Sequence, residues 1–199
     1  MIDQHDEQFE PGGRLPAPNA ALQELQAFVN TNDIEEERDE IGTPAKLHDW
    51  LVVRGALGES DRVTSEDQRR AVAVREGLRA LGRANNGDDL DHARVDELNA
   101  AAATLPLSAG IGDAQAWRLT PAMRGVDGYL AGMVATLVTA MADGTWSRMK
   151  ACHNDTCRWL FYDSSRNRSG TWCSMAVCGS RLKARAYRAR QRESARTPA

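Results

Sequence analysis

The stretch that decides the fold is "ACHNDTCRWLFYDSSRNRSGTWCSMAVCGS", residues 151–180, which contains all four cysteines of the 199-residue chain. The cysteines form two pairs, and each pair has four residues between its members. Two cysteine knuckles close together in the chain are the pattern of a structural zinc site with an all-cysteine shell. We therefore expect one structural Zn²⁺ ion, with Cys152, Cys157, Cys173 and Cys178 as its ligands.

Other uses of the four cysteines stay open at this point. The acidic N-terminus "MIDQHDEQFE" has no apolar core of an export signal, so we expect a cytoplasmic protein in which disulfides are disfavoured. Free thiols that cluster by chance, or a thiol redox switch, are the alternatives. His153 follows Cys152 directly, but four cysteines already complete a tetrahedral shell, so we expect this histidine to face solvent.

The spacing also predicts the path of the chain. Two residues five apart on a regular helix lie about 140° apart around its axis, so the chain must turn between Cys173 and Cys178. Between the knuckles, "RWLFYD" alternates in polarity, the polar "SSRNRSG" makes a turn and "TWC" returns, which predicts a hairpin. Knuckle, hairpin, knuckle and helix is the order of a treble-clef-like zinc module, and Ser180 is the expected N-cap of its helix.

A basic helix is expected after the second knuckle. Four arginines at spacings i, i+4, i+7 and i+11 form one stripe, namely Arg181, Arg185, Arg188 and Arg192. Such a stripe suits contact with phosphates or a DNA groove, although a solvated C-terminal helix is the plainer alternative. The candidate nucleic-acid contacts are these four residues with Lys183, and with Arg166 and Arg168 of the predicted hairpin.

The charge of the chain is divided between its two parts. Residues 148–199 contain 12 Lys or Arg and 3 acids, a formal charge of +9, while residues 1–147 contain 13 basic and 25 acidic residues, a charge of −12. This asymmetry predicts a basic end that meets an anion. The hydrophobic segments are too short or too interrupted to span a bilayer, so no membrane role is expected.

The body is predicted to be α+β. Helical periodicity begins at Ala20, at Pro44 behind the N-cap Thr43, at Ser65 behind the capping box of Thr64 with Asp67, and near Asp91. Alternation through residues 107–111 and 115–119 predicts a β-hairpin, and "GVDGYLAGMVATLVTAMADG" predicts a buried helix with Val126, Leu130, Met133, Leu137 and Met141 inward. We place the boundaries at 1–20 (irregular lead-in), 21–147 (mostly helical α+β body) and 148–199 (zinc module with basic helix).

Two segments resemble known bacterial domains. "KACHNDTCRWLFYDSSRNRSGTWCSMAVCGSRLKARAYRARQR" (150–192) resembles the CGNR zinc finger, and "PGGRLPAPNAALQELQAFVNTND" (11–33) with "TPAKLHDWL" (43–51) resembles the ABATE domain that accompanies it. The resemblance implies a zinc-binding transcription regulator whose body senses a ligand or partner, with Arg181 and Lys183 among the basic residues of the signature. This chain has Ser180 where the family name has Asn, so an amide contact to DNA would be weakened there, whereas a helix cap would be kept.

We therefore expect a DNA-binding regulator rather than an enzyme. The alternative is a zinc-dependent thiol sensor, or an adaptor whose basic helix binds an acidic protein surface. For enzymatic use the body offers only lone polar residues, Asn30, Thr31 and His48, and "FVNT" is better explained as a helix end. No catalytic residue is assigned.

Overall fold

The computed structural model describes residues 16–112 and 116–180. In that part of the chain, helices dominate and three separate two-stranded antiparallel ribbons accompany them. The helices of the body are α1 (Ala20–Val29), α2 (Pro44–Val53), α3 (Ser65–Ala84), α4 (His92–Ala102) and α5 (Gly125–Ala142). The ribbons pair β1 (Asn32–Asp33) with β2 (Arg38–Asp39), β3 (Leu107–Ile111) with β4 (Trp117–Pro121), and β5 (Met149–Ala151) with β6 (Leu160–Tyr162). The predicted α+β class is confirmed.

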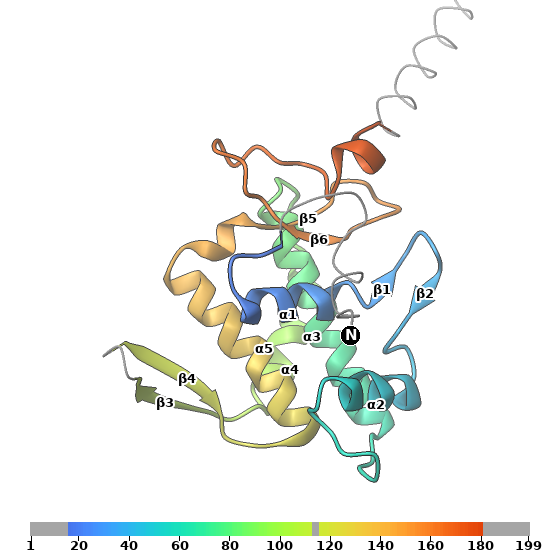
Figure 1. The fold of residues 1–199 in the computed structure, drawn as a ribbon, viewed down its shortest axis with the longest axis vertical. Helices are drawn as coiled ribbons and strands as arrows, with labels where there is room; N and C mark the ends of the chain where they lie inside the picture. Colours follow the sequence, from blue (N-terminus) through green and yellow to red (C-terminus); the bar gives the residue numbers. More distant parts are fainter. Residues whose placement is uncertain (1–15, 113–115, 181–199) are drawn as a thin grey trace, which may run out of the picture.

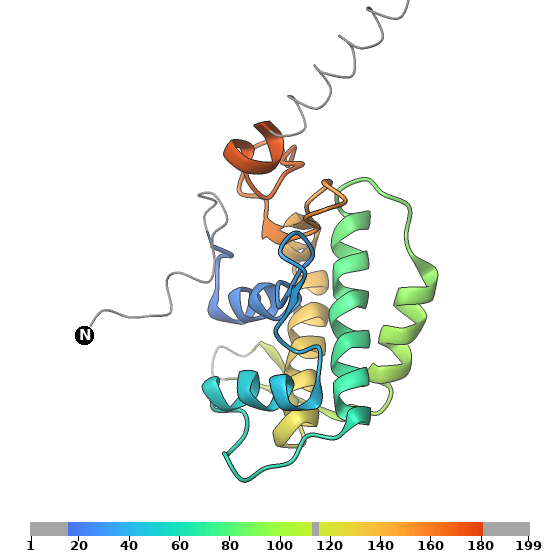
Figure 2. The same cartoon turned by 90° about the vertical axis from the view of Figure 1, so that its right-hand side faces the viewer.

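Helix α3 is the longest element of the body, and the other helices pack around it (Figure 1). It starts at the predicted capping box, in which the Thr64 side chain accepts from the backbone of Asp67 and the Asp67 carboxylate accepts from that of Thr64. Helix α4 runs back alongside it as an antiparallel partner (Figure 2). Thr43 caps α2 ahead of Pro44, also as predicted. These starts were predictable because each depends on residues within one helical turn.

Helix α5 crosses the centre of the body, and its inward face includes the fully buried Leu130 and Ala131. Four of its five predicted inward residues lie inside, but Met141 is 46% exposed, because the inward face ends at Ala140 one position earlier. Of the residues described, this helix alone is long and apolar enough to cross a membrane by length and composition. Core helices of soluble proteins pass the same test.

The hydrophobic core continues from the body into the zinc module. Met149, Ala151 and Leu160 belong to the same buried cluster as Leu25 and Phe28 of α1. Strands β5 and β6 therefore rest on the body, at one end of the molecule (Figures 1 and 2). A second, smaller cluster contains the four cysteines and Phe161. The division of the chain at residues 147 and 148 stays a prediction.

The pairing of β6 corrects the hairpin that the sequence predicted. Leu160–Tyr162 pairs with the preceding Met149–Ala151, in the register Ala151 with Leu160 and Met149 with Tyr162, and not with the returning segment at Thr171–Cys173. The reason is burial: this pairing directs Leu160 and Ala151 into the body core, which local alternation of polarity cannot reveal.

The acidic run at residues 33–40 connects the short strands β1 and β2, and its centre, around Glu36, is exposed. Asp39 at its end forms a bidentate ion pair with Arg75 of α3, with N–O distances of 2.7 and 2.9 Å. This ion pair attaches the β1–β2 turn to α3.

A close crossing of α3 and α4 generates the first prediction. A Cβ atom at Gly77 would lie 2.4 Å from Leu98 Cβ and 3.0 Å from the Arg94 carbonyl oxygen, so Gly77→Ala must push α4 away. We expect a loss of about 1–3 kcal/mol in the free energy of unfolding, measured by urea denaturation. Gly132→Ala in α5 is the control: its nearest neighbour lies 3.9 Å away, so it should stabilise by up to about 1 kcal/mol. Equal responses of the two variants would contradict this packing.

Candidate zinc centre

The four cysteine sulfurs gather in one buried cluster and lie within 4.8 Å of one another. The Cys157 and Cys173 sulfurs are 3.5 Å apart, and those of Cys173 and Cys178 are 3.6 Å apart. These separations are far too long for disulfide bonds. They match the edge of about 3.8 Å that a tetrahedron of sulfurs has around zinc at a Zn–S distance of about 2.3 Å. The cluster fits one structural zinc ion, and four sulfurs leave no open position for catalysis.

The thiols perturb one another strongly. Hydrogen bonds from its neighbours, that from Cys157 first, lower the pKa of Cys152 to about 2, while the bond to Cys152 raises the pKa of Cys157 and that of Cys173. A divalent cation favours the deprotonated form of its cysteine ligands, because it binds thiolates and releases their protons.

The first knuckle is shaped by Asn154, a residue that sequence reasoning missed. Its carbonyl oxygen accepts from the backbone N–H groups of Cys157 and Arg158, which closes the turn. Its side-chain amide is buried and lies 3.7 Å from the Cys178 sulfur of the other knuckle. A hydrogen bond of this kind orients a ligand and stabilises its thiolate. In the sequence, the only indication of this role was the position of a polar residue, Asn154, between Cys152 and Cys157.

The second knuckle begins its helix earlier than the sequence indicated. Ser174 is extended and caps the π-helix Met175–Gly179 by accepting from Val177 N–H, so the chain turns directly after Cys173, as the spacing required. Ser180 was predicted as the N-cap, and this is wrong: its φ of −69° and ψ of −40° are helical, and its hydroxyl donates to Met175 O. The cap lies earlier because Cys178 must sit on the first turn to reach the cluster.

An ion pair inside the module holds the loop between the knuckles. Lys150 Nζ donates to Asp163 at 2.8 Å and also to the carbonyl oxygens of Arg168 and Gly170. Asp163 is fully buried and accepts from the backbone N–H groups of Ser165 and Gly170. Burial opposes its charge, but these hydrogen bonds, with that of Lys150 foremost, hold the pKa of Asp163 well below its usual range.

Three asparagines of the body bind the backbone of the zinc module. The Asn30 side chain donates to Leu160 O and accepts from Leu160 N–H, at 2.9 and 2.7 Å, as a neighbouring strand would. Asn85 donates to Trp146 O and Met149 O, and Asn86 to Ala151 O and Thr171 O. "FVNT" is thus a helix end, as expected: Asn30 is the C-cap of α1, and Thr31 donates to Phe28 O.

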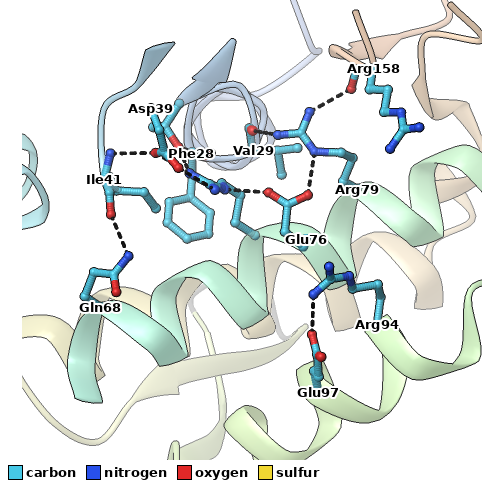
Figure 3. Close-up of polar contacts among 12 residues, drawn as sticks. Phe28, Val29, Asp39, Ile41, Gln68, Glu76, Arg79, Arg94, Glu97 and Arg158 are labelled. Atoms are coloured by element: carbon cyan, nitrogen blue, oxygen red, sulfur yellow. Dashed lines mark hydrogen bonds and ion pairs between the residues drawn. The ribbon is translucent and has the colours of Figure 1, made fainter. Parts of the chain in front are cut away.

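A buried ion network on α3 completes this contact (Figure 3). Arg79 donates to Val29 O at the end of α1 and to Arg158 O in the first knuckle, while Glu76 accepts from both Arg75 and Arg79. Burial opposes the charge of Glu76, but the Arg79 and Arg75 guanidinium groups outweigh it and lower the pKa of the carboxyl. The body and the first knuckle therefore share one polar interior.

The other predicted site residues are distributed unevenly. His153 is half-exposed and pairs with Asp88 at 3.1 Å, outside the sulfur cluster, in agreement with its expected solvent-facing position. Arg166 and Arg168 are exposed on the loop after β6, where Arg168 also contacts Ser147. Arg181, Lys183, Arg185, Arg188 and Arg192 lie outside the described residues. Within the described residues, the ion-pair and hydrogen-bond partner of His48 is its neighbour Asp49.

Comparison with known families identifies both parts of the chain. Residues 25–145 match the ABATE family, described as "Putative stress-induced transcription regulator". The chain belongs to the ABATE family. Residues 148–191 match the CGNR zinc finger, which contains the four clustered cysteines. No curated protein matches this ABATE protein. Both matched families are of regulatory and zinc-finger type, and neither is an enzyme family.

The sulfur cluster predicts how zinc responds to substitution. Cys173→Ser should lower the bound zinc well below one ion per chain, because the oxygen that replaces this thiolate binds zinc poorly. Zinc is measured by metal analysis after dialysis against a weak chelator. His153→Ala is the matched control and should keep one ion. Full zinc retention by Cys173→Ser, or loss in the control, would contradict the four-cysteine shell. Acidification should release zinc, since protons compete for the thiolates.

The Lys150–Asp163 pair predicts a large effect of an isosteric change. Asp163→Asn leaves a buried ammonium without its counter-charge and should cost about 3–5 kcal/mol in unfolding free energy at neutral pH. Because the pKa of Asp163 is lowered by folding, this contribution is complete above the unfolded pKa and disappears as pH falls through the folded one. Asp155→Asn, whose side chain is 73% exposed, should change stability by less than about 0.5 kcal/mol. Urea denaturation of the zinc-loaded protein measures both.

Proposed function

We propose that this ABATE protein is a cytoplasmic, bacterial, zinc-dependent DNA-binding regulator of transcription. The observation that carries the proposal is the continuity of the second zinc knuckle with the basic segment. Cys178 lies on the short helix Met175–Gly179, and the arginine-rich stretch begins in the sequence at Arg181, two positions after the last residue of that helix. In this proposal Cys152, Cys157, Cys173 and Cys178 bind the zinc, and the metal orders the base from which the basic stretch extends.

The hydrogen bonds between the body and the backbone of the zinc module support the regulatory part of the proposal. Asn30, Asn85, Asn86 and Arg79 all connect the body to backbone groups of the module. A ligand or protein partner that alters the body would therefore alter the support of the module. The candidate DNA contacts are Arg181, Lys183, Arg185, Arg188 and Arg192, with the exposed Arg166 and Arg168.

Burial of the cysteines weighs against the thiol-sensor alternative. All four are at most 5% exposed, whereas cysteines that sense oxidants are accessible. The adaptor alternative shares the basic segment with the DNA-binding proposal and differs in the partner, an acidic protein surface in place of DNA. Selection from random DNA separates the two, because an adaptor enriches no sequence.

The test is selection of bound fragments from random DNA by the zinc-loaded full chain, followed by salt titration of the selected site. We expect enrichment, and an affinity that falls steeply with salt because phosphate contacts release counterions. Arg188→Gln should reduce the salt slope by about one unit, since one phosphate contact is lost. Arg69→Gln in α3, a 67% exposed arginine far from the zinc module in sequence, should leave the slope unchanged.

Cys173→Ser is the metal control in this experiment and should abolish enrichment. Absence of binding at low salt with zinc fully loaded would overturn the proposal. Enrichment that survives in Cys173→Ser would show that the zinc module is dispensable for it.

A further inference from the structure

A cleft of about 630 Å³ lies where the α3–α4 hairpin meets the first zinc knuckle. Its walls include Glu76, Arg79 and Arg83 of α3, Arg94 of α4, and Arg158 of the knuckle. The volume is within the range of small-molecule sites, about 300–1,000 Å³. The lining contains four arginines and four acidic residues, so it suits a polar, charged ligand and not an apolar one.

Two of these arginines are already committed to the structure. Arg79 is 3% exposed and donates to Glu76, Val29 O and Arg158 O. Arg83 pairs with Asp88 and with Asp155. In the same way, Glu76 accepts from both Arg75 and Arg79. These groups therefore have few donors to offer a ligand.

Arg158 and Arg94 keep donors available. Within the described residues, the only ion pair of Arg158 is a 3.5 Å contact to Asp155, whose side chain is 73% exposed, and its Nε lies buried with no hydrogen-bond partner. Arg94 contacts Glu97 on its own helix, and its side chain is 47% exposed. Exposed pairs of this kind contribute little, so both guanidinium groups can turn to a stronger acceptor at small cost.

The two side chains come from different elements that line the same cleft. In Figure 3, Arg158 lies beside Arg79 at the knuckle, and Arg94 lies on α4 with its guanidinium group directed at Glu97. The backbone of Arg158 has a φ of +54°, a conformation that residues other than glycine adopt uncommonly. Arg79 holds the carbonyl of that residue, so the knuckle aims the Arg158 side chain at this place.

We propose that this cleft binds a small ligand through a phosphate or carboxylate group held between Arg158 and Arg94. Guanidinium groups bind both anions with paired N–H donors. Asp89 and Asp91 line the same cleft and are exposed, so they can accept from hydroxyl or ammonium groups elsewhere on the ligand. This inference deepens the ligand-sensing part of the proposed function, because it names the ligand chemistry and places the ligand between the body and the zinc knuckle.

The test titrates the zinc-loaded full chain with inorganic phosphate and, separately, with succinate, followed by NMR of the arginine Nε–H groups. We expect saturable shifts at Arg158 and Arg94 with at least one probe. Arg158→Asn should weaken binding at least about tenfold, the loss of one charged hydrogen-bonding group. Asparagine is chosen because it tolerates a positive φ.

Arg94→Gln, on an exposed helix surface, provides a second variant whose folding is not at risk and should weaken binding comparably. Arg69→Gln is the matched control, since this arginine lies outside the cleft and should leave binding within about twofold. Saturation by phosphate alone assigns a phosphorylated ligand, saturation by succinate alone assigns a carboxylated one, and saturation by both assigns a general anion site.

Absence of saturation with both probes would overturn the inference. Unchanged affinity in Arg158→Asn and Arg94→Gln, or an equal loss in Arg69→Gln, would overturn it as well. No DNA is present in this experiment, so its failure leaves the DNA-binding proposal standing, and failure of DNA selection leaves the anion site standing.

Discussion

One buried guanidinium group, that of Arg79, joins the parts of this protein. It lies on α3 and donates at once to the carboxylate of Glu76, to the last residue of α1 and to the Arg158 carbonyl of the first zinc knuckle. A buried charge of this kind is tolerated only when its donors are satisfied, so the three segments must keep their relative positions. The end of α1, the C-terminal half of α3 and the knuckle are therefore held together by one side chain.

The consequence is that the zinc module does not stand alone. Met149, Ala151 and Leu160 complete the core of the body, and Asn30 binds the backbone of Leu160 in the manner of an adjacent strand. A module with so small a core of its own gains stability from the metal and from this support together. A structural change in the zinc site or in the body would therefore alter the contact between them. The polar cleft lies at this contact.

Local chemistry was predictable from the chain, and contacts between distant segments were not. The cysteine pairs, the capping box at Thr64, Pro44 behind its cap and the inward residues Leu130 and Leu137 depend on neighbours a few positions away. The hairpin partner of Leu160–Tyr162 and the helix start at Ser174 depend on which surface is buried and where a sulfur must point. Alternation of polarity alone favoured a hairpin with the returning segment, and cap preference alone favoured Ser180 as the N-cap.

The sequence by itself indicated one structural zinc ion within residues 152–178, because sulfur ligands in two close pairs suit that metal, and the gathering of the four sulfurs in the folded chain agrees with it. It also determined the order of helices in the body. Only the tertiary structure decided that Asn30, Asn85, Asn86 and Arg79 support the zinc module, and that Arg158 and Arg94 face one cleft. Asn30 and Leu160 are 130 positions apart, and such contacts are selected by burial and hydrogen-bond satisfaction in the folded chain, which no local pattern records.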